Sequence, residues 1–460
     1  MTIFRMTDAQ QTRLKTHLHD GTGLEAVAVG LCGRGGTPER PVFSICEITE
    51  IPHEECRRFP DRVTWPTRQL KLMLARARTE GLAVFKMHSH PTGATAFSSL
   101  DDRSDADLFS AIALKAPGQH LSAVMLPDGK IFARRMDSGL VAGPVSRVSL
   151  VGNNLQFWTN GEEDWTVSRD FDQRHRQAFG DRTTQLLAGM SVAIIGVSGT
   201  GSSIVEMLAR LGVGRIVLVE FDIVETKNLN RIWGARRKDA ANRLNKARAI
   251  KSHIDGLGLG TEIVIVEDRI EAPEAIALVS GCDVAFGCMD SVEGRDVLNR
   301  LATFYILPYI DMGVRLNADG SGGIASISAG IHYLVPGRSS LRTRGVYTED
   351  DLRAEHLHRT DPVFYADQLQ RGYIKGVNVD RPAVISINTA TASAAVNELL
   401  ARLHPFRTRP NSEFAIQKIL FTHGRLLSRS EGHDDTLLSP HVGKGNTEPP
   451  LLLPRLSVAA

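Results

Sequence analysis

The sequence has few cysteines, no long hydrophobic run and almost no net charge, and each scarcity excludes a class of protein. Five irregularly spaced cysteines in 460 residues do not form a disulfide framework. A net charge of +2 gives no bulk attraction for nucleic acid or for a membrane surface, so neither is expected as a partner. No apolar run approaches the ~20 residues that cross a bilayer, and the first residues do not resemble a signal peptide. We therefore expect a cytoplasmic protein.

The length and the composition predict more than one globular domain. A chain of 460 residues is long enough for two or more domains, and a hydrophobic fraction of 42% supports full cores. Strand-like and helical stretches predict a first domain over residues 1–150 and a second over residues 171–430. A polar connector, residues 151–170, separates them. Residues 431–460 are rich in Gly, Pro, Ser and His and lack periodicity, so we expect a flexible tail.

Two histidines and a carboxylate in the first domain have the spacing of a metal site. His88 and His90 follow a predicted buried strand, and side chains at positions i and i+2 of a strand point the same way. Ser98 is a predicted helix N-cap, which places Asp101 in the first helical turn. Two imidazoles and one carboxylate are the ligand count of a catalytic zinc site that keeps its fourth position for water.

The same residues carry a resemblance to a known family. The pattern His88-x-His90-Pro, followed by Ser98-x-x-Asp101, resembles the JAMM motif of the Mov34/MPN/JAB-type α/β metallopeptidases. The resemblance implies that His88, His90 and Asp101 bind zinc, which lowers the pKa of a bound water. It also implies that Ser98 donates a hydrogen bond to the oxyanion that develops during cleavage.

That family also needs a glutamate upstream of the histidines as general base. Glu25 stands just before a Gly-rich strand end, as the family's glutamate does, and is our choice. In the resemblance it takes a proton from the zinc-bound water and returns it to the leaving amine. Glu47 and Glu50, on the next predicted strand, are the alternatives.

The second domain begins with a Gly-rich turn. An apolar strand leads into Gly196, Gly199 and Gly201, a helix follows over residues 204–211, and the strand over residues 215–222 ends in acids. This is the βαβ nucleotide-binding arrangement, in which glycines allow close approach of the backbone and the helix N-terminus faces phosphate. Taken alone, the turn favours a dinucleotide-binding Rossmann domain.

The residues after the turn change that interpretation. Residues 221–231 closely resemble the DxDxVxxxNLNR segment of the ThiF/MoeB/ubiquitin-activating adenylyltransferase family, a Rossmann-like fold with a mainly parallel sheet. Arg231 and Lys246 stand at family spacing, and the resemblance implies that they surround the phosphates of ATP. Residues 176–180 resemble the family's RQ…G helix, whose arginine, here Arg176, reaches the ATP site of a neighbouring subunit. A homodimer is thereby implied.

The resemblance assigns the remaining ligands of the nucleotide. Asp290 follows a strand-like run, as the family's metal-binding aspartate does, and would hold Mg²⁺. Asp222 would fix the ribose, and Asn228 would fix the loop and the phosphate geometry. The cofactors implied for the whole chain are therefore zinc, ATP and Mg²⁺.

The sequence departs from the second family at three places. Ser198 stands where a glycine is usual, and Ile232 where a glutamine often follows the arginine. No cysteine occurs after Cys288, so the thioester cysteine of some relatives and the C-x-x-C pairs of zinc-bearing relatives are both missing. Cys282 and Cys288 lie on an apolar strand, and we expect them to be buried core thiols.

Together the two resemblances indicate a bacterial fusion that serves a ubiquitin-like modification system. The first domain would cleave after the C-terminal glycine of a ubiquitin-like protein, and the second would adenylate that C-terminus. The activated protein would then pass to a thiol or amine on another protein, such as a conjugating-enzyme-like partner. Two alternatives remain open: activation of a sulfur-carrier protein for cofactor or cysteine biosynthesis, and a non-catalytic scaffold.

Overall fold

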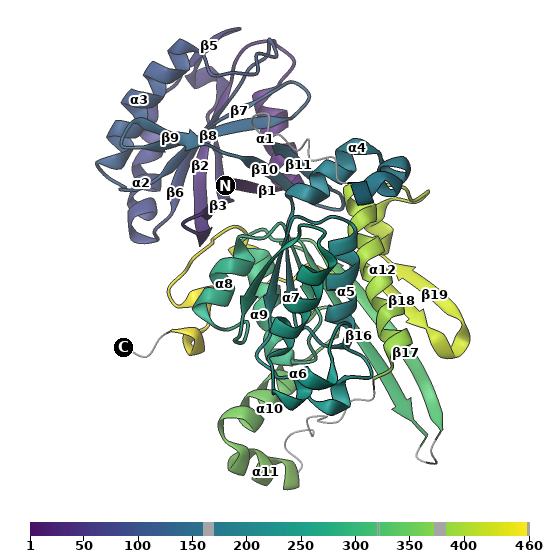
Figure 1. Ribbon diagram of the computed structural model, residues 1–460. Coiled ribbons are helices and arrows are strands. Elements are labelled where there is room, and N and C mark those ends of the chain that lie inside the picture. The colour runs from purple at the N-terminus through teal and green to yellow at the C-terminus, as the bar shows by residue number, and fades with distance from the viewer. Residues whose placement is uncertain (160–169, 320, 322, 372–382, 458–460) are drawn as a thin grey trace. The chain divides into compact units, whose positions relative to one another are not determined.

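The computed structural model describes residues 1–159, 170–319, 321, 323–371 and 383–457. The chain separates into two compact units. The first contains Met1–Asp164, Thr303–Ile306 and Pro440–Ala460, and the second contains Trp165–Ala302 and Leu307–Ser439. Each unit is built on its own sheet with helices packed against it, so both have the expected α/β class (Figure 1).

The first unit contains a nine-stranded mixed sheet in its described residues, in the order β11-β10-β1-β3-β2-β6-β7-β8-β9. Its strands are β1 (Ile3–Thr7), β2 (Val27–Thr37), β3 (Arg40–Glu50), β6 (Ala83–Ser89), β7 (His120–Met125), β8 (Ile131–Asp137), β9 (Leu140–Pro144), β10 (Arg147–Val151) and β11 (Leu155–Thr159). A separate hairpin joins β4 (Arg57–Phe59) to β5 (Arg62–Thr64), and the helices are α1 (Asp8–Leu18), α2 (Leu70–Thr79) and α3 (Ser99–Ala113).

Alternation along the central strands divides the core of this unit into two apolar clusters. In β6, Phe85 and Met87 belong to the cluster that contains the buried leucines of α1. Val84 belongs to the other cluster, together with buried residues of α2 and α3. Because side chains alternate along a strand, His88 is turned to the same face as Val84, the face that α3 covers.

The second unit is built on an eight-stranded sheet in the order β14-β13-β12-β15-β16-β17-β18-β19. Its strands are β12 (Ser191–Ile195), β13 (Arg215–Val219), β14 (Glu262–Val266), β15 (Val284–Gly287), β16 (Tyr309–Ala318), β17 (Ile324–Leu334), β18 (Ile416–Leu420) and β19 (Arg425–Arg429). The helices are α4 (Gln173–Gly189), α5 (Gly199–Arg210), α6 (Arg237–Ala241), α7 (Lys246–Leu257), α8 (Pro273–Ser280), α9 (Val292–Phe304), α10 (Glu349–Thr360), α11 (Pro362–Gln370) and α12 (Ile385–Leu403).

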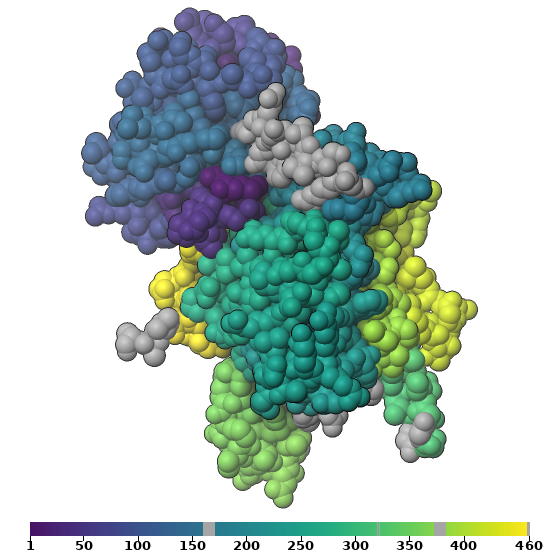
Figure 2. All heavy atoms as spheres, viewed as in Figure 1, coloured from purple at the N-terminus to yellow at the C-terminus, as the bar shows by residue number. Residues whose placement is uncertain are grey.

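The first five strands of that order are parallel, and the last three continue the sheet in antiparallel fashion. The order reverses at β12, because β12 pairs with β13 on one side and with β15 on the other. In an open α/β sheet, ligands bind outside the carboxyl ends of the strands at such a switch point. Helices α10 and α11 form a protrusion from the body of this unit (Figure 2).

Two expectations about the domain layout differ from the structure. Residues 151–159 were expected in a connector, but β11 pairs with β10 there and extends the first sheet, while residues 160–169 lie outside the described residues. The tail is packed against the first unit in its described part. The amide of Gly33 donates to the Gly443 carbonyl at 3.0 Å, and the amide of Asn446 donates to the Arg34 carbonyl at 2.7 Å. The sequence pattern did not predict this docking, because the contacts are made by backbone groups rather than by a periodic set of side chains.

Among the described residues, no helix is long and apolar enough to cross a membrane.

The docking of the tail predicts a position-specific effect of alanine. A Cβ atom at Gly443 would lie 2.0 Å from the Ile45 carbonyl oxygen, and Gly443 has a φ of 74° that disfavours any side chain. We expect Gly443→Ala to speed hydrogen exchange of the Asn446 amide, measured by mass spectrometry. Gly432→Ala is the matched control, because nothing lies within 4 Å of its Cβ position. Equal exchange in both variants would show that the tail does not depend on this contact.

Candidate functional site

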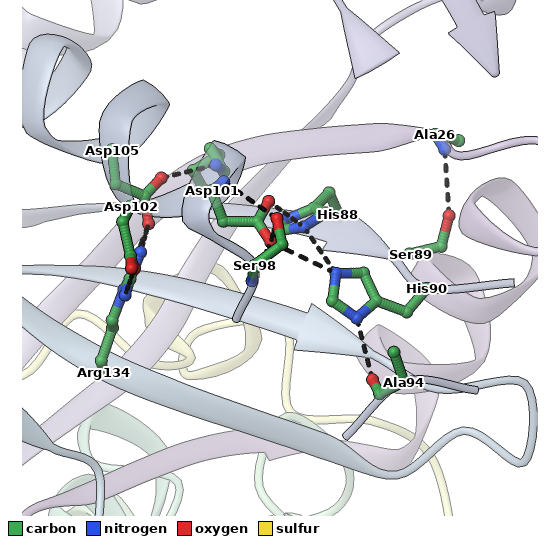
Figure 3. A network of polar contacts seen from close by, with 11 residues as sticks. Ala26, His88, Ser89, His90, Ala94, Ser98, Asp101, Asp102, Asp105 and Arg134 are labelled. Atoms are coloured by element: carbon green, nitrogen blue, oxygen red, sulfur yellow. Dashed lines mark hydrogen bonds and ion pairs between the residues drawn. The ribbon is translucent and has the colours of Figure 1, made fainter. Parts of the chain in front are cut away.

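Two histidines and an aspartate meet where the end of β6 faces the start of α3 (Figure 3). The Nε2 atoms of His88 and His90 are 3.2 Å apart. Asp101 presents one carboxylate oxygen to His88 Nε2 at 2.9 Å and the other to His90 Nε2 at 3.5 Å. The histidines are buried, and Asp101 is largely buried. The structure thus brings together all three residues that the sequence predicts as zinc ligands.

The spacing of these atoms fits a tetrahedral metal ion. Two nitrogens that each lie about 2.0–2.1 Å from a tetrahedral zinc ion are roughly 3.3 Å apart, close to the 3.2 Å between His88 and His90. The other ring nitrogen of His90, Nδ1, lies 2.8 Å from the Ala94 carbonyl oxygen. A ring nitrogen that donates to a carbonyl fixes the tautomer, so the lone pair of His90 Nε2 is turned toward the shared point.

The surroundings set the charge of each member of this group. Burial lowers the pKa of His88 to about 4, so its imidazole is neutral at physiological pH. Burial opposes ionisation of Asp101, but hydrogen bonds from His88 and His90 outweigh it and hold the pKa of that carboxyl well below its usual range. Burial acts to lower the pKa of His90, but hydrogen bonds to Asp101 and Ala94 and the nearby carboxylates together raise it, so a metal ion competes with a proton for this ring.

Glu25 lies beside the histidines without touching them. One oxygen of Glu25 lies within 4.8 Å of ligand atoms of both His88 and His90, so these three residues also form a possible metal-binding group. Among the described residues no group donates a hydrogen bond to its carboxylate, and burial raises its pKa to about 7. Asp101 contacts both histidines directly, whereas the Glu25 oxygen lies within 4.8 Å of their ligand atoms without a hydrogen bond or ion pair to either. The geometry therefore favours Asp101 as ligand and Glu25 as base.

The two alternative glutamates are engaged elsewhere. Glu47 forms an ion pair with Arg76 of α2. Glu50 forms an ion pair with Arg13 of α1 at 2.8 Å. Neither belongs to the group of possible ligands around the histidines.

Backbone contacts that the sequence did not reveal hold Glu25 in place. Arg58 of β4 donates from Nε to the Glu25 carbonyl at 2.8 Å, and the Glu25 amide donates to the Phe59 carbonyl at 2.8 Å. The amide of Ala26 donates to the hydroxyl of Ser89, which lies between the two histidines in sequence, at 2.9 Å (Figure 3). The Glu25 segment is thus tied both to the hairpin and to the strand that carries His88.

Ser98 caps α3, as predicted. Its hydroxyl accepts from the Asp101 amide at 3.1 Å and donates to the Asp101 carboxylate at 2.7 Å, which completes a capping box. The carboxylate of Asp101 is therefore oriented from its own helix end. Ser98 is exposed, and its role as an oxyanion donor stays a prediction.

In the second unit, close backbone approach requires the predicted glycines. Gly196 ends β12 with a φ of 88°, and a Cβ at Gly201 would lie 1.9 Å from the Gly196 carbonyl oxygen. A Cβ at Gly199 would lie 2.1 Å from the side-chain nitrogen of Asn388 in α12. Asn388, which the sequence did not single out, therefore lies against the N-terminus of α5.

Acids at the end of β13 have separate roles. Glu220 is buried, and its carboxylate accepts from the Val197 amide at 2.7 Å and from the Asp222 amide at 2.9 Å. It joins the Gly-rich turn to the neighbouring strand. Asp222 has a half-exposed side chain, and Lys246 donates to it at 2.8 Å. Of these two acids Asp222 is the exposed one, and its role in binding a ribose stays a prediction.

Arg231 and Asn228 belong to one turn beside the glycines. The side-chain oxygen of Asn228 accepts from the Glu225 amide at 3.0 Å. The backbone carbonyl of Asn228 accepts from the Arg231 amide at 3.1 Å. The Cδ atom of Arg231 is 3.5 Å from the Cβ position of Gly199. Asn228 thus shapes the turn that brings Arg231 to the start of α5.

Asp290 follows β15, across the switch point from the Gly-rich turn. The Cβ position of Gly196 lies 3.0 Å from the Cys288 carbonyl group, so the two loops are in contact. Asp290 is exposed. Burial of Arg295 acts to lower the pKa of its guanidinium, and the nearby charge of Asp290 is one of the effects that raise that pKa instead. Arg295 is itself held by buried Asp311 at 3.1 Å.

Arg176 is not brought to these residues by any contact within the described part of the chain. It pairs with Asp172 one turn earlier in the chain, at 2.8 Å. Of the two thiols expected on a strand as core residues, Cys282 is buried and Cys288 is only partly buried, and they flank β15 rather than lie on it. Cys282 is fully buried, and burial raises the pKa of the Cys288 thiol well above its usual value.

Comparisons with known proteins agree with this division into two sites. Residues 8–132 match the family model of prokaryotic homologues of the JAB domain, and residues 172–340 match that of the ThiF family. Ubiquitin-like modifier-activating enzyme 5 of Dictyostelium discoideum is 30% identical over 166 residues, 34% of this chain and 41% of the relative. The enzyme of the same name from Oryza sativa subsp. japonica is 28% identical over 160 residues, 33% of this chain and 36% of the relative.

A solved structure of E. coli MccB with MccA-N7isoASN covers 60% of this chain and 76% of its own, with 17% identity and a TM-score of 0.46. That likeness is too low to carry an inference about function. The chain spans less than half the length of the two curated relatives. The two family matches, which follow one another along the sequence, show that the chain joins an N-terminal domain homologous to JAB domains of prokaryotes to a domain of the ThiF family.

Proposed function

We propose that this chain is a bifunctional enzyme of a bacterial ubiquitin-like system. Its first domain cleaves after the C-terminal glycine of a ubiquitin-like protein, and its second domain adenylates that C-terminus. The observation that carries the proposal is the convergence of His88, His90 and Asp101 on one point, with Glu25 standing off beside it. The ThiF match and the likeness to ubiquitin-like modifier-activating enzymes support the second activity.

In the peptidase reaction, His88, His90 and Asp101 would hold a zinc ion. The ion would supply a Lewis acid and a bound water whose pKa is lowered to ~7. Glu25 takes a proton from the attacking water and later delivers it to the leaving amine. The carbonyl carbon gains the water oxygen, the C–N bond breaks, and the products are a free carboxylate and an amine. To donate to the oxyanion, Ser98, which is exposed at the same helix end, turns its one hydroxyl hydrogen away from the Asp101 carboxylate.

In the adenylation reaction, a carboxylate attacks the α-phosphate of ATP and pyrophosphate leaves. Both reactants are negatively charged, so the site must neutralise charge without reacting itself. Arg231 and Lys246 provide positive charge near the N-terminus of α5 and near Asp222. Asp290, exposed beside the Gly-rich turn, would hold Mg²⁺, and Asp222 would bind the ribose.

The proposal includes a homodimer in which Arg176 acts on the ATP of the neighbouring subunit. Its support is that Arg176, half-buried against Asp172, makes no contact with the other predicted phosphate ligands of its own chain among the described residues. The adenylated protein would pass to a thiol or amine of a separate acceptor.

Activation of a sulfur-carrier protein is the second candidate. It uses the same adenylation residues and differs only in what attacks the adenylate. Burial of Cys282 and the raised pKa of the partly buried Cys288 thiol favour a nucleophile from outside this unit in both cases. A non-catalytic scaffold is the least supported, because unpaired buried ligands such as Glu25 cost folding stability without a compensating role.

Zinc content tests the metal site. We expect about one zinc per chain in protein purified with zinc present, because three ligands converge, and a loss of that zinc in His88→Ala. His423→Ala is the control, because His423 is exposed and distant in sequence. The measurement is elemental analysis, with circular dichroism to show that each variant is folded. A wild-type protein without zinc would contradict the proposal.

Glu25→Gln separates the base from the ligands. The variant should keep its zinc and lose cleavage of a ubiquitin-like substrate extended beyond its C-terminal glycine, by roughly 10²–10⁴-fold in kcat, because a general base is removed. Glu50→Gln is the matched control, since Glu50 is paired with Arg13 and should leave cleavage unchanged. Normal cleavage by Glu25→Gln would place the base elsewhere.

The buried thiols predict how the activated protein is released. A thioester needs an accessible thiolate; burial denies access to Cys282, and the raised pKa of the Cys288 thiol opposes its ionisation. Replacing both by alanine should leave ATP–pyrophosphate exchange nearly intact, whereas Lys246→Ala should abolish it. No reducible adduct with the ubiquitin-like protein should form. A thiol-sensitive adduct on a non-reducing gel, lost in Cys288→Ala, would overturn transfer to an external acceptor.

A further inference from the structure

The strand and the helix that supply the metal-binding residues are joined at a second point by charge. Lys86 precedes His88 by two residues on β6, so both side chains face α3. Asp105 follows Asp101 by one helical turn, so both face β6. Lys86 Nζ donates to Asp105 at 2.5 Å, one turn away from the contact between His88 and Asp101.

Arg134 of β8 connects the same helix to a third element. Its guanidinium donates to Asp105 at 2.7 Å and to Asp102 at 2.5 Å, so it binds two carboxylates of the first turns of α3. It also lies 3.8 Å above the ring of Phe97, in the loop that leads into this helix. The helix start therefore has little freedom to rotate about its axis or slide along the sheet.

Aromatic contacts extend this arrangement to the other histidine. The ring of Phe97 lies 5.1 Å from that of Phe132, and the ring of Phe132 lies 6.1 Å from that of His90, both in edge-on geometry. Arg134 and Phe132 both belong to β8. The elements that carry His88, His90 and Asp101 are thus held to one another through side chains that do not themselves contact the proposed metal position.

Burying these three charges costs desolvation free energy, so a gain in folding stability alone does not explain them. Lys86, Asp105 and Arg134 are 5%, 0% and 7% exposed. Replacing a buried ion pair by apolar residues of similar volume is often neutral or stabilising, because the charges must be stripped of water. A buried charge network has a second use, since its fixed hydrogen-bond directions define one orientation of the helix, whereas apolar packing tolerates small shifts.

We propose that Lys86, Asp105 and Arg134 are positioning residues that set the orientation of α3 and so hold the Asp101 carboxylate against His88 and His90. This inference rests on the proposed zinc peptidase function. Residues that do not bind the metal but hold its ligands in place typically weaken metal affinity by about 10–100-fold when they are removed. Lys86 and Asp105 accordingly act on zinc binding and on kcat rather than on recognition of the substrate.

The test compares Asp105→Asn and Lys86→Met with Asp107→Asn. Asp107 is exposed on the same helix and forms no ion pair among the described residues, so it controls for the loss of one helical carboxylate. Zinc affinity is measured by competition with a chromogenic chelator, and folding by circular dichroism of the metal-free proteins. We expect Asp105→Asn to weaken zinc binding by about ten-fold or more, as is typical when a residue that supports a metal ligand is lost. Lys86→Arg, which keeps the charge, should bind zinc more tightly than Lys86→Met.

At saturating zinc, Asp105→Asn should lower kcat with little change in KM when kcat is calculated per folded, zinc-loaded molecule, a correction that removes the effect of a general loss of stability. If Asp105→Asn does not fold, Lys86→Met decides, because it leaves Asp105 paired with Arg134. A folded variant that binds zinc as tightly as Asp107→Asn would overturn the inference while leaving the proposed function intact. A wild-type protein that binds no zinc would instead overturn the proposed function.

Discussion

The contact between the end of β6 and the first turn of α3 is the constraint on which the first unit's chemistry depends. A strand end alone can present two imidazoles, and a helix end alone can present one carboxylate. The two are useful only when His88 Nε2 and the Asp101 carboxylate meet, here at 2.9 Å. The surrounding features serve that meeting. The capping box orients the carboxylate, Ser89 and Arg58 bring the Glu25 segment alongside, and burial keeps His88 neutral.

The proposed site of the second unit is built for anions rather than for a peptide bond. It lies at β12, which pairs with β13 on one side and with β15 on the other, and the loops after β12 and β15 touch there. A helix N-terminus and nearby cations give such a place a positive potential that suits phosphate. Buried Glu220 fixes the Gly-rich turn, whereas Asp222 is half-exposed and paired with Lys246.

The two sites share a use of burial to set reactivity. Burial raises the pKa of Glu25 to about 7, which suits a group that must accept and then return a proton. Burial likewise raises the pKa of the Cys288 thiol, which disfavours a thiolate beside the Gly-rich turn. The same physical effect thus lets Glu25 hold a proton near neutral pH in one unit and keeps a thiol protonated in the other.

Local patterns in the sequence determined the α/β class, the order of the two domains, the strand and capped helix around His88 and Asp101, and the Gly-rich turn. Periodicity, capping and glycine requirements act over a few residues, so they can be read directly. Tertiary structure alone decided which glutamate lies beside the histidines, because Glu25, Glu47 and Glu50 differ only in where their strands place them. It also decided the roles of Lys86, Arg134, Arg58 and Asn388, and the docking of the tail through Gly443. Each of these depends on a partner remote along the chain, and only the packing of the sheets and helices brings such partners within reach.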